Sequence, residues 1–339
     1  MITIRKIAEL AGVSRGTVDR VINKRGGVSK FAEQRVSDIV KRYGFKPNKV
    51  ARALVKSKKL YTIGVVSATL DNVFFRDVVR GIRRAESELA DLGFSVDYRE
   101  VARFSVPDQI AAIDAMLERG IDALAINPIN DDVVRAKLAE IAGLGIPVVT
   151  FNSDIEGVER LAYIGCDYRR SGRIAAGLLA MASREPREIA IVTGSRKSLG
   201  HCLRVEGFSE EIERHPGMRV ADVVEMFDDD VTSYARVRGL LEKNAGIDAF
   251  FFCAAGKAGG IRAIADLRPR GETIIVTVDM DDFTRECLLD GTVVATVCQQ
   301  PYVQGYDPLW QLANYLMHGD RPPQVQFTQA EIVIRQSVN

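Results

Sequence analysis

Residues 3–23 read TIRKIAELAGVSRGTVDRVIN, a stretch that predicts two short helices separated by a tight turn. Thr3 is placed to cap the first helix, whose apolar residues share one face. Gly12 can supply the positive φ of the turn. Ser14 is placed to cap a second helix that runs to about Asn23. The pattern indicates a helix-turn-helix, a motif whose second helix enters the major groove of DNA.

The polar face of the second predicted helix carries the residues suited to DNA. Val18 and its apolar neighbours point inward, which leaves Arg15 and Arg20 outside for base edges or phosphates. A third helix over about 30–43 would close a small core. We therefore expect residues 1–46 to form an all-α DNA-binding domain.

The charge distribution supports a nucleic-acid-binding end. Residues 1–59 hold 16 Lys and Arg against 4 Asp and Glu, whereas the rest of the chain holds 30 against 41. Within the basic end, residues 47–59 predict a hinge helix of about eight residues that begins near Pro47. Isolated helices this short are marginal in water, so the segment needs a partner, either DNA or a second copy of itself.

From Leu60 onward, short β-rich runs alternate with amphipathic helices. This alternation predicts parallel sheets covered by helices on both faces. The number of strands suits two lobes better than one sheet. The predicted fold is thus an N-terminal helix-turn-helix domain with a hinge helix, followed by a two-lobed α/β domain over 60–339. We expect the N-lobe to hold about 60–163 and 296–327, and the C-lobe about 164–295 and 328–339.

Polar residues follow several of the predicted strands. Because ligands of open α/β sheets bind beyond the carboxyl ends of the strands, we expect these residues to share one cleft. Their amides and carboxylates suit hydrogen bonds with hydroxyl groups, and two adjacent aromatic side chains, Phe74 and Phe75, could stack on a sugar ring. The polar residues are Asn72, Asn127, Asn152, Asp279 and Gln299.

The N-terminal stretch, continued through YGFKPNKVARALVKSKKLYTIGVV, resembles the lactose-repressor (LacI/GalR) family of transcription regulators. The resemblance implies a homodimer, or a higher oligomer, that reads a pseudo-palindromic double-stranded operator. It also implies hinge helices that fold on DNA and insert a leucine, here Leu54, into the minor groove. Gly16 and Asp19 depart from the family pattern and leave the operator sequence open. The expected DNA-contacting residues are Thr3, Ser14, Arg15, Gly16, Thr17, Arg20, Asn23, Asn48, Ala51 and Leu54.

Residues 60–339 resemble the ligand domain of the same regulators and the periplasmic ribose-type sugar-binding proteins. The motifs ATLDNVFF and AINPINDD carry this resemblance, which adds His201, Arg204 and Tyr234 to the expected ligand-binding residues. Asn152-Ser153 stands where the family has an Asp-Arg pair. Since several charged contacts are missing, we expect a small neutral polyhydroxylated ligand, such as a sugar or cyclitol, and a regulator that acts as a repressor.

Other classes of function fit the sequence less well. No catalytic, cofactor or metal motif is complete, the five cysteines are scattered, and GKAGG at 256–260 is read as a loop and helix start rather than a phosphate site. We therefore expect no catalytic residue, no cofactor and no metal. The N-terminus lacks a signal peptide and no apolar run is long enough for a membrane helix, so we expect a cytoplasmic protein. The alternatives are a transport-type solute-binding protein, or an activator or co-repressor-dependent regulator.

Overall fold

The computed structural model describes residues 4–22, 27–42, 60–68, 73–102, 104–183, 185 and 187–338. The chain divides into two compact units, residues 1–58 and 59–339. Several sequence predictions lie outside the described residues: the hinge helix within 47–59, Thr3, Asn23, Asn48, Ala51, Leu54 and Asn72.

The N-terminal unit contains the three predicted helices, α1 (Ile4–Ala11), α2 (Arg15–Ile22) and α3 (Lys30–Arg42). Gly12 takes a φ of 65° in the turn between α1 and α2, a conformation that glycine adopts without strain. The Thr17 N–H donates to Ser14 Oγ at 3.1 Å, so Ser14 caps α2 as predicted. The core of the unit is made by Ile7, Ala8, Ala11, Val18 and Val36.

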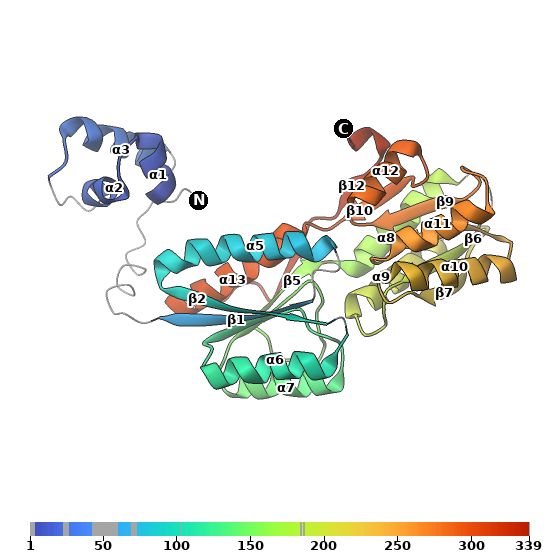
Figure 1. Ribbon diagram of the computed structural model, residues 1–339, viewed down its shortest axis with the longest axis horizontal. Helices are drawn as coiled ribbons and strands as arrows, with labels where there is room; N and C mark the ends of the chain where they lie inside the picture. Colours follow the sequence, from blue (N-terminus) through green and yellow to red (C-terminus); the bar gives the residue numbers. More distant parts are fainter. Residues whose placement is uncertain are drawn as a thin grey trace. The chain divides into compact units, whose positions relative to one another are not determined.

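The N-lobe of the second unit is built on a sheet with the strand order β11-β5-β4-β3-β1-β2, and its described strands pair in parallel. Figure 1 shows α5 and α13 on one face of this sheet and α6 and α7 on the other. The strands are β1 (Tyr61–Ala68), β2 (Phe94–Val101), β3 (Ala123–Ile126), β4 (Val148–Phe151), β5 (Ala162–Cys166) and β11 (Val325–Thr328). The helices are α5 (Val73–Leu89), α6 (Val106–Arg119), α7 (Asp132–Gly143) and α13 (Pro301–His318), with a 3₁₀ turn η1 (Ala90–Leu92).

The C-lobe sheet has the order β12-β10-β9-β8-β6-β7, and β12 is antiparallel to β10. One apolar core lies between the sheet and α8 and α9, and another lies between the sheet and α10, α11 and α12. The strands are β6 (Arg187–Thr193), β7 (Met218–Glu225), β8 (Ile247–Phe252), β9 (Ile274–Val278), β10 (Ala295–Cys298) and β12 (Glu331–Val333). The helices are α8 (Tyr168–Ala182), α9 (Leu199–Ile212), α10 (Asp230–Lys243), α11 (Lys257–Leu267), α12 (Asp282–Asp290) and the 3₁₀ turn η2 (Arg335–Ser337).

The chain passes between the lobes after β5, after β10 and after β11. The last N-lobe strand before the first passage ends at Cys166, three residues beyond the predicted change at 163. The second passage follows Cys298 rather than residue 295, because β10 belongs to the C-lobe sheet. The two-lobed α/β architecture is confirmed. The sequence reading did not foresee β7, β11 or β12.

Glycines let the helices on each sheet approach closely. A Cβ at Gly81 of α5 would lie 2.2 Å from the Tyr302 carbonyl oxygen, and one at Gly305 of α13 would lie 1.9 Å from that of Val78. The C-lobe repeats the arrangement: a Cβ at Gly172 of α8 would lie 2.1 Å from the Arg204 carbonyl oxygen of α9. These contacts leave no space for a side chain, so the absent Cβ sets the helix–helix distance.

Among the described residues, no helix combines the length and apolar character required to cross a membrane.

Candidate functional site

A polar cavity of about 90 Å³ opens at the carboxyl ends of strands from both lobes, several times the ~10–15 Å³ that one water molecule occupies. Four of its polar residues come directly after a strand: Asn127 after β3, Asn152 after β4, Asp279 after β9 and Gln299 after β10. This is the position that ligand-binding residues take in open α/β sheets. Of the sequence-predicted ligand residues, the structure brings these to the cavity wall: Phe74, Phe75, Asn127, Asn152, His201, Arg204, Asp279 and Gln299.

The backbone at two strand ends turns immediately into the left-handed region. Asn152 has a φ of 59° and Asp279 a φ of 60°. Asn and Asp tolerate this conformation better than other residues with a Cβ. The sequence therefore places at these turns the side chains that both permit the turn and carry hydrogen-bonding groups into the cavity.

Arg204 is a buried cation in the cavity wall. Only 2% of the residue is exposed, its guanidinium lies 4.7 Å from the centre of the Tyr168 ring, and its Nη1 donates to the Cys253 carbonyl at 2.6 Å. Burial disfavours its charge, but Asp279 and smaller contributions from Cys166, Tyr168 and Cys253 together outweigh burial, so the pKa of Arg204 is raised. Its Nε and Nη2 donors have no hydrogen-bond partner among the described residues. Because buried donors are costly to leave unpaired, a bound ligand is the natural acceptor.

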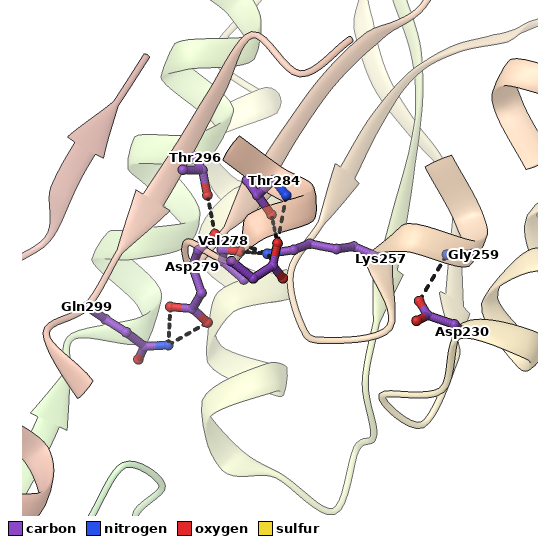
Figure 2. Close-up of polar contacts among 9 residues, drawn as sticks. Asp230, Lys257, Gly259, Val278, Asp279, Thr284, Thr296 and Gln299 are labelled. Carbon is purple, nitrogen blue, oxygen red and sulfur yellow. Dashed lines mark hydrogen bonds and ion pairs between the residues drawn. The ribbon is translucent and has the colours of Figure 1, made fainter. Parts of the chain in front are cut away.

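Asp279 and Gln299 form an adjoining pair. Gln299 Nε2 donates to the two carboxylate oxygens of Asp279 at 2.9 and 3.1 Å (Figure 2). Burial raises the pKa of Asp279, although the charges of Arg204 and Lys257 offset part of that effect. Gln299 Oε1 is buried without a hydrogen-bond partner among the described residues. The pair therefore offers acceptors beside the free donors of Arg204.

His201 is held in its neutral form. Burial lowers its pKa from 6.5 to about 4, and the nearby positive charge of Arg204 adds to the effect. The Ser195 N–H donates to His201 Nδ1 at 3.0 Å. Nδ1 also lies 3.2 Å from the Ser195 carbonyl oxygen, so the Ser195 backbone holds the ring in place, and the neutral imidazole has one donor and one acceptor nitrogen.

The two asparagines are fixed by neighbours. Asn152 Nδ2 donates to Tyr168 Oη and to Gln304 Oε1, both at 3.1 Å. Asn127 Oδ1 accepts from the Ser153 N–H at 3.2 Å. Tyr168 belongs to the C-lobe helix α8, so its bond to Asn152 ties the two lobes together beside the cavity.

Sequence reasoning missed several residues of this wall. Gln109 is 2% exposed, and its amide group donates to the Asn127 carbonyl and accepts from the Ile129 N–H. A glutamine within the apolar face of a predicted helix is a signal that could have found it. Phe104, Tyr168, Lys197 and Ser198 also line the cavity, and no local pattern distinguishes them.

Tyr234 is the predicted ligand residue that the structure places elsewhere. It lies on α10, its ring packs against the C-lobe core, and its hydroxyl donates to Asp266 at 2.8 Å. It is not part of the cavity wall. The aromatic surface of the cavity comes instead from Phe74, Phe75, Phe104 and Tyr168.

In the N-terminal unit, α2 presents a polar face opposite its buried Val18. Arg15, Gly16 and Arg20 are exposed and Thr17 is half-buried. Ser14 Oγ lies 2.9 Å from Thr17 Oγ1. The predicted DNA-contacting residues that the structure describes thus lie on one accessible surface at α2.

Comparisons with known proteins match both units. Residues 63–320 match the periplasmic binding protein domain, and residues 3–48 match the bacterial regulatory proteins of the lacI family. Catabolite control protein A of Priestia megaterium is 25% identical over 93% of this chain and 90% of its own length. The transcriptional regulator CelR of Thermobifida fusca is 27% identical over 83% of this chain and 82% of its own.

The glucose-galactose binding protein GanP of Geobacillus stearothermophilus superposes with a TM-score of 0.77 at 25% identity, covering 82% of this chain and 98% of that protein. The relatives found are transcription regulators and sugar-binding proteins, not enzymes. With a helix-turn-helix unit joined to a two-lobed ligand domain, the chain belongs to the lacI family of bacterial regulatory proteins and is a DNA-binding transcription regulator.

Proposed function

We propose that this regulator is a repressor whose operator affinity is controlled by a small neutral polyhydroxylated ligand, a sugar or a cyclitol, bound in the interlobe cavity. The observation that carries the proposal is the set of unpaired groups in the wall. Arg204 offers two free donors, and Gln299 Oε1 offers a free acceptor beside Asp279. A hydroxyl group both donates and accepts, so a polyol can satisfy the whole set.

The charge of the wall supports a neutral ligand. Lys197 and Arg204 are balanced by Asp228 and Asp279 among the lining residues, while His201 is neutral at physiological pH because burial lowers its pKa to about 4. An ionised ligand would leave a buried charge uncompensated, which is costly. The likeness to a glucose-galactose binding protein supports the sugar class.

On the DNA side, we infer a cytoplasmic homodimer that binds a pseudo-palindromic operator, with two hinge segments that meet and fold on DNA. Ligand binding between the lobes would shift the two N-lobes of the dimer and so change whether the hinges can meet. The family resemblance supports this mechanism. It predicts that Leu54→Gly weakens operator binding at least about tenfold by removing the minor-groove wedge, with unchanged ligand affinity. Equal operator affinity of variant and wild type in a gel-shift assay would exclude the wedge.

A thermal-shift screen tests the ligand class. We expect one of D-glucose, D-galactose, D-fucose, D-tagatose, arabinose or myo-inositol to raise the melting temperature. A ligand at 100 times its Kd stabilises by about 2.7 kcal/mol. Asp279→Ala should abolish the shift, and Tyr234→Phe, outside the cavity, should retain it. A shift produced by glucuronate but by none of the neutral compounds would contradict the proposal.

A further inference from the structure

Lys257 is a buried lysine directly behind the ligand cavity. It is the first residue of α11 and only 4% exposed. Its Nζ donates to the Val278 carbonyl at 2.7 Å and to the Asp279 carbonyl at 3.0 Å (Figure 2). The same atom lies 3.3 Å from Asp281 Oδ2. An ammonium has three donors, and three acceptors surround this one. The ammonium of Lys257 is therefore fully used within the protein. Through this lysine, the GKAGG segment binds the backbone at the end of β9 rather than a phosphate.

The turn after β9 explains why donors are needed there. The last backbone hydrogen bond from the end of β9 to β10 is the one that the Asp279 N–H donates to the Val297 carbonyl at 3.0 Å. Asp279 then takes a φ of 60° and turns the chain away from the sheet. The carbonyls of Val278 and Asp279 lose regular ladder partners at this point, and a buried carbonyl requires a donor. Lys257 supplies one to each, and Thr296 Oγ1 supplies a second to Asp279 at 3.0 Å.

Asp281 fixes the ammonium from the other side. Its Oδ1 accepts from the Thr284 N–H at 2.7 Å and so caps α12. Burial would raise the pKa of Asp281, but the charge of Lys257 and the hydrogen bonds from Thr284 outweigh it and lower the pKa. The ionised pair joins the first turn of α11 to the start of α12, with the Asp279 turn between them.

The glycines of GKAGG bring α11 close enough for this contact. Gly256 precedes the helix with a φ of 77°. A Cβ at Gly259 would lie 1.8 Å from the Asp230 carbonyl oxygen, and the Gly259 N–H donates to Asp230 Oδ1 at 2.9 Å (Figure 2). Since α11 is pinned against the first residue of α10, the Lys257 side chain has a fixed origin and reaches the Asp279 turn.

We propose that Lys257 is a positioning residue of the ligand site, which holds the backbone of Val278 and Asp279 so that the Asp279 carboxylate stays beside Gln299 and Arg204. The inference rests on the proposed function in one respect, because it assumes that the ligand contacts Asp279. Lys257 itself contacts only the protein.

Chemical rescue of a truncated side chain tests the proposal. Lys257→Ala removes a propylammonium group, and Lys257 borders a second cavity of about 130 Å³ that gives a small amine access. We expect Lys257→Ala to bind the stabilising sugar of the panel at least about tenfold more weakly in calorimetry, the loss expected for removing hydrogen bonds to buried carbonyls. Amide hydrogen exchange across 278–281 should accelerate in the same variant. Propylammonium should restore both properties in part, and 1-propanol should restore neither.

Control variants distinguish the loss of a positioning contact from a general destabilisation of the fold. Lys137→Ala removes a lysine that pairs with Asp114 and Glu140 on the N-lobe, away from the cavity, and should leave both readouts unchanged. If Lys257→Ala does not fold, Lys257→Met keeps the aliphatic stem and removes the charge. The proposal would be overturned if Lys257→Ala kept the amide hydrogen exchange of the wild type and a sugar affinity within about twofold of the wild type. Rescue by 1-propanol equal to that by propylammonium would also overturn it. If no panel compound binds the wild type, the proposed function fails, and the exchange readout still decides the role of Lys257.

Discussion

At the scale of single residues, the cavity wall contains polar groups whose burial costs free energy when no ligand pairs with them. Arg204 keeps two unpaired donors and Gln299 an unpaired acceptor, while Asp279 is half-buried and its pKa is raised chiefly by desolvation. Protein groups of this kind are retained where a ligand completes them. The strand-end rule was enough to predict Asn127, Asn152, Asp279 and Gln299 from the sequence. Arg204 and His201 lie on a helix and came from the family resemblance alone.

His201 gives a prediction for pH dependence. Its pKa is about 4 in the folded protein and 6.5 for the ordinary side chain. Between these values the unfolded chain takes up the proton and the folded chain does not, so stability falls as the pH drops from 6.5 towards 4. His201→Gln removes this titration and should make the free energy of unfolding less dependent on pH by up to about 3 kcal/mol over the window.

Urea unfolding at several pH values measures this effect through Trp310, the only tryptophan of the sequence. Subtracting the variant's free energy of unfolding from that of the wild type at each pH cancels the contribution of the carboxylates, which both proteins share. A difference that stays constant from pH 7 to about pH 4 would show that the folded protein does not hold His201 in its neutral form.

At the scale of elements, the regular helices and central strands followed from apolar periodicity. The missed strands have a common physical reason. β7, β11 and β12 are edge strands of their sheets, and nearly all of their residues are half-buried or exposed. Such strands lack the continuous apolar run by which buried parallel strands are found. The Gln109 and Tyr168 contacts with Asn127 and Asn152 depend on tertiary packing, and no sequence spacing encodes them.

The crossing of α8 and α9 positions Arg204 and gives an element-scale prediction. Gly172→Ala places a Cβ 2.1 Å from the Arg204 carbonyl oxygen, so α9 must move. We expect a loss of about 1–3 kcal/mol in stability and weaker ligand binding. Gly177→Ala on the same helix has no atom within 4 Å of the new Cβ and should stabilise by about 0.5–1 kcal/mol. Urea unfolding and calorimetry measure both, and equal effects of the two substitutions would contradict the close crossing.

At the scale of the whole molecule, the basic end and the charge-balanced cavity should respond differently to salt. Residues 1–59 hold 16 Lys and Arg against 4 Asp and Glu, and DNA binding by such a segment releases counterions. Operator affinity should fall at least about a hundredfold between about 50 and 200 mM salt. The affinity for a neutral ligand should change less than about twofold. Parallel anisotropy and calorimetry titrations provide the comparison, and a ligand affinity as salt-dependent as the operator affinity would indicate an ionised ligand.

The central claim is that one chain couples a sugar-type ligand to DNA affinity. The measurement that tests it most directly is a fluorescence anisotropy titration with labelled DNA from upstream of the protein's own gene, with and without the sugar that stabilises it. We predict that the saturating sugar changes operator affinity about 5–150-fold in the wild type, the usual range of allosteric coupling, and leaves it unchanged in Asp279→Ala. Tight sugar binding with no change in DNA affinity, or DNA binding without preference for that sequence, would contradict the account.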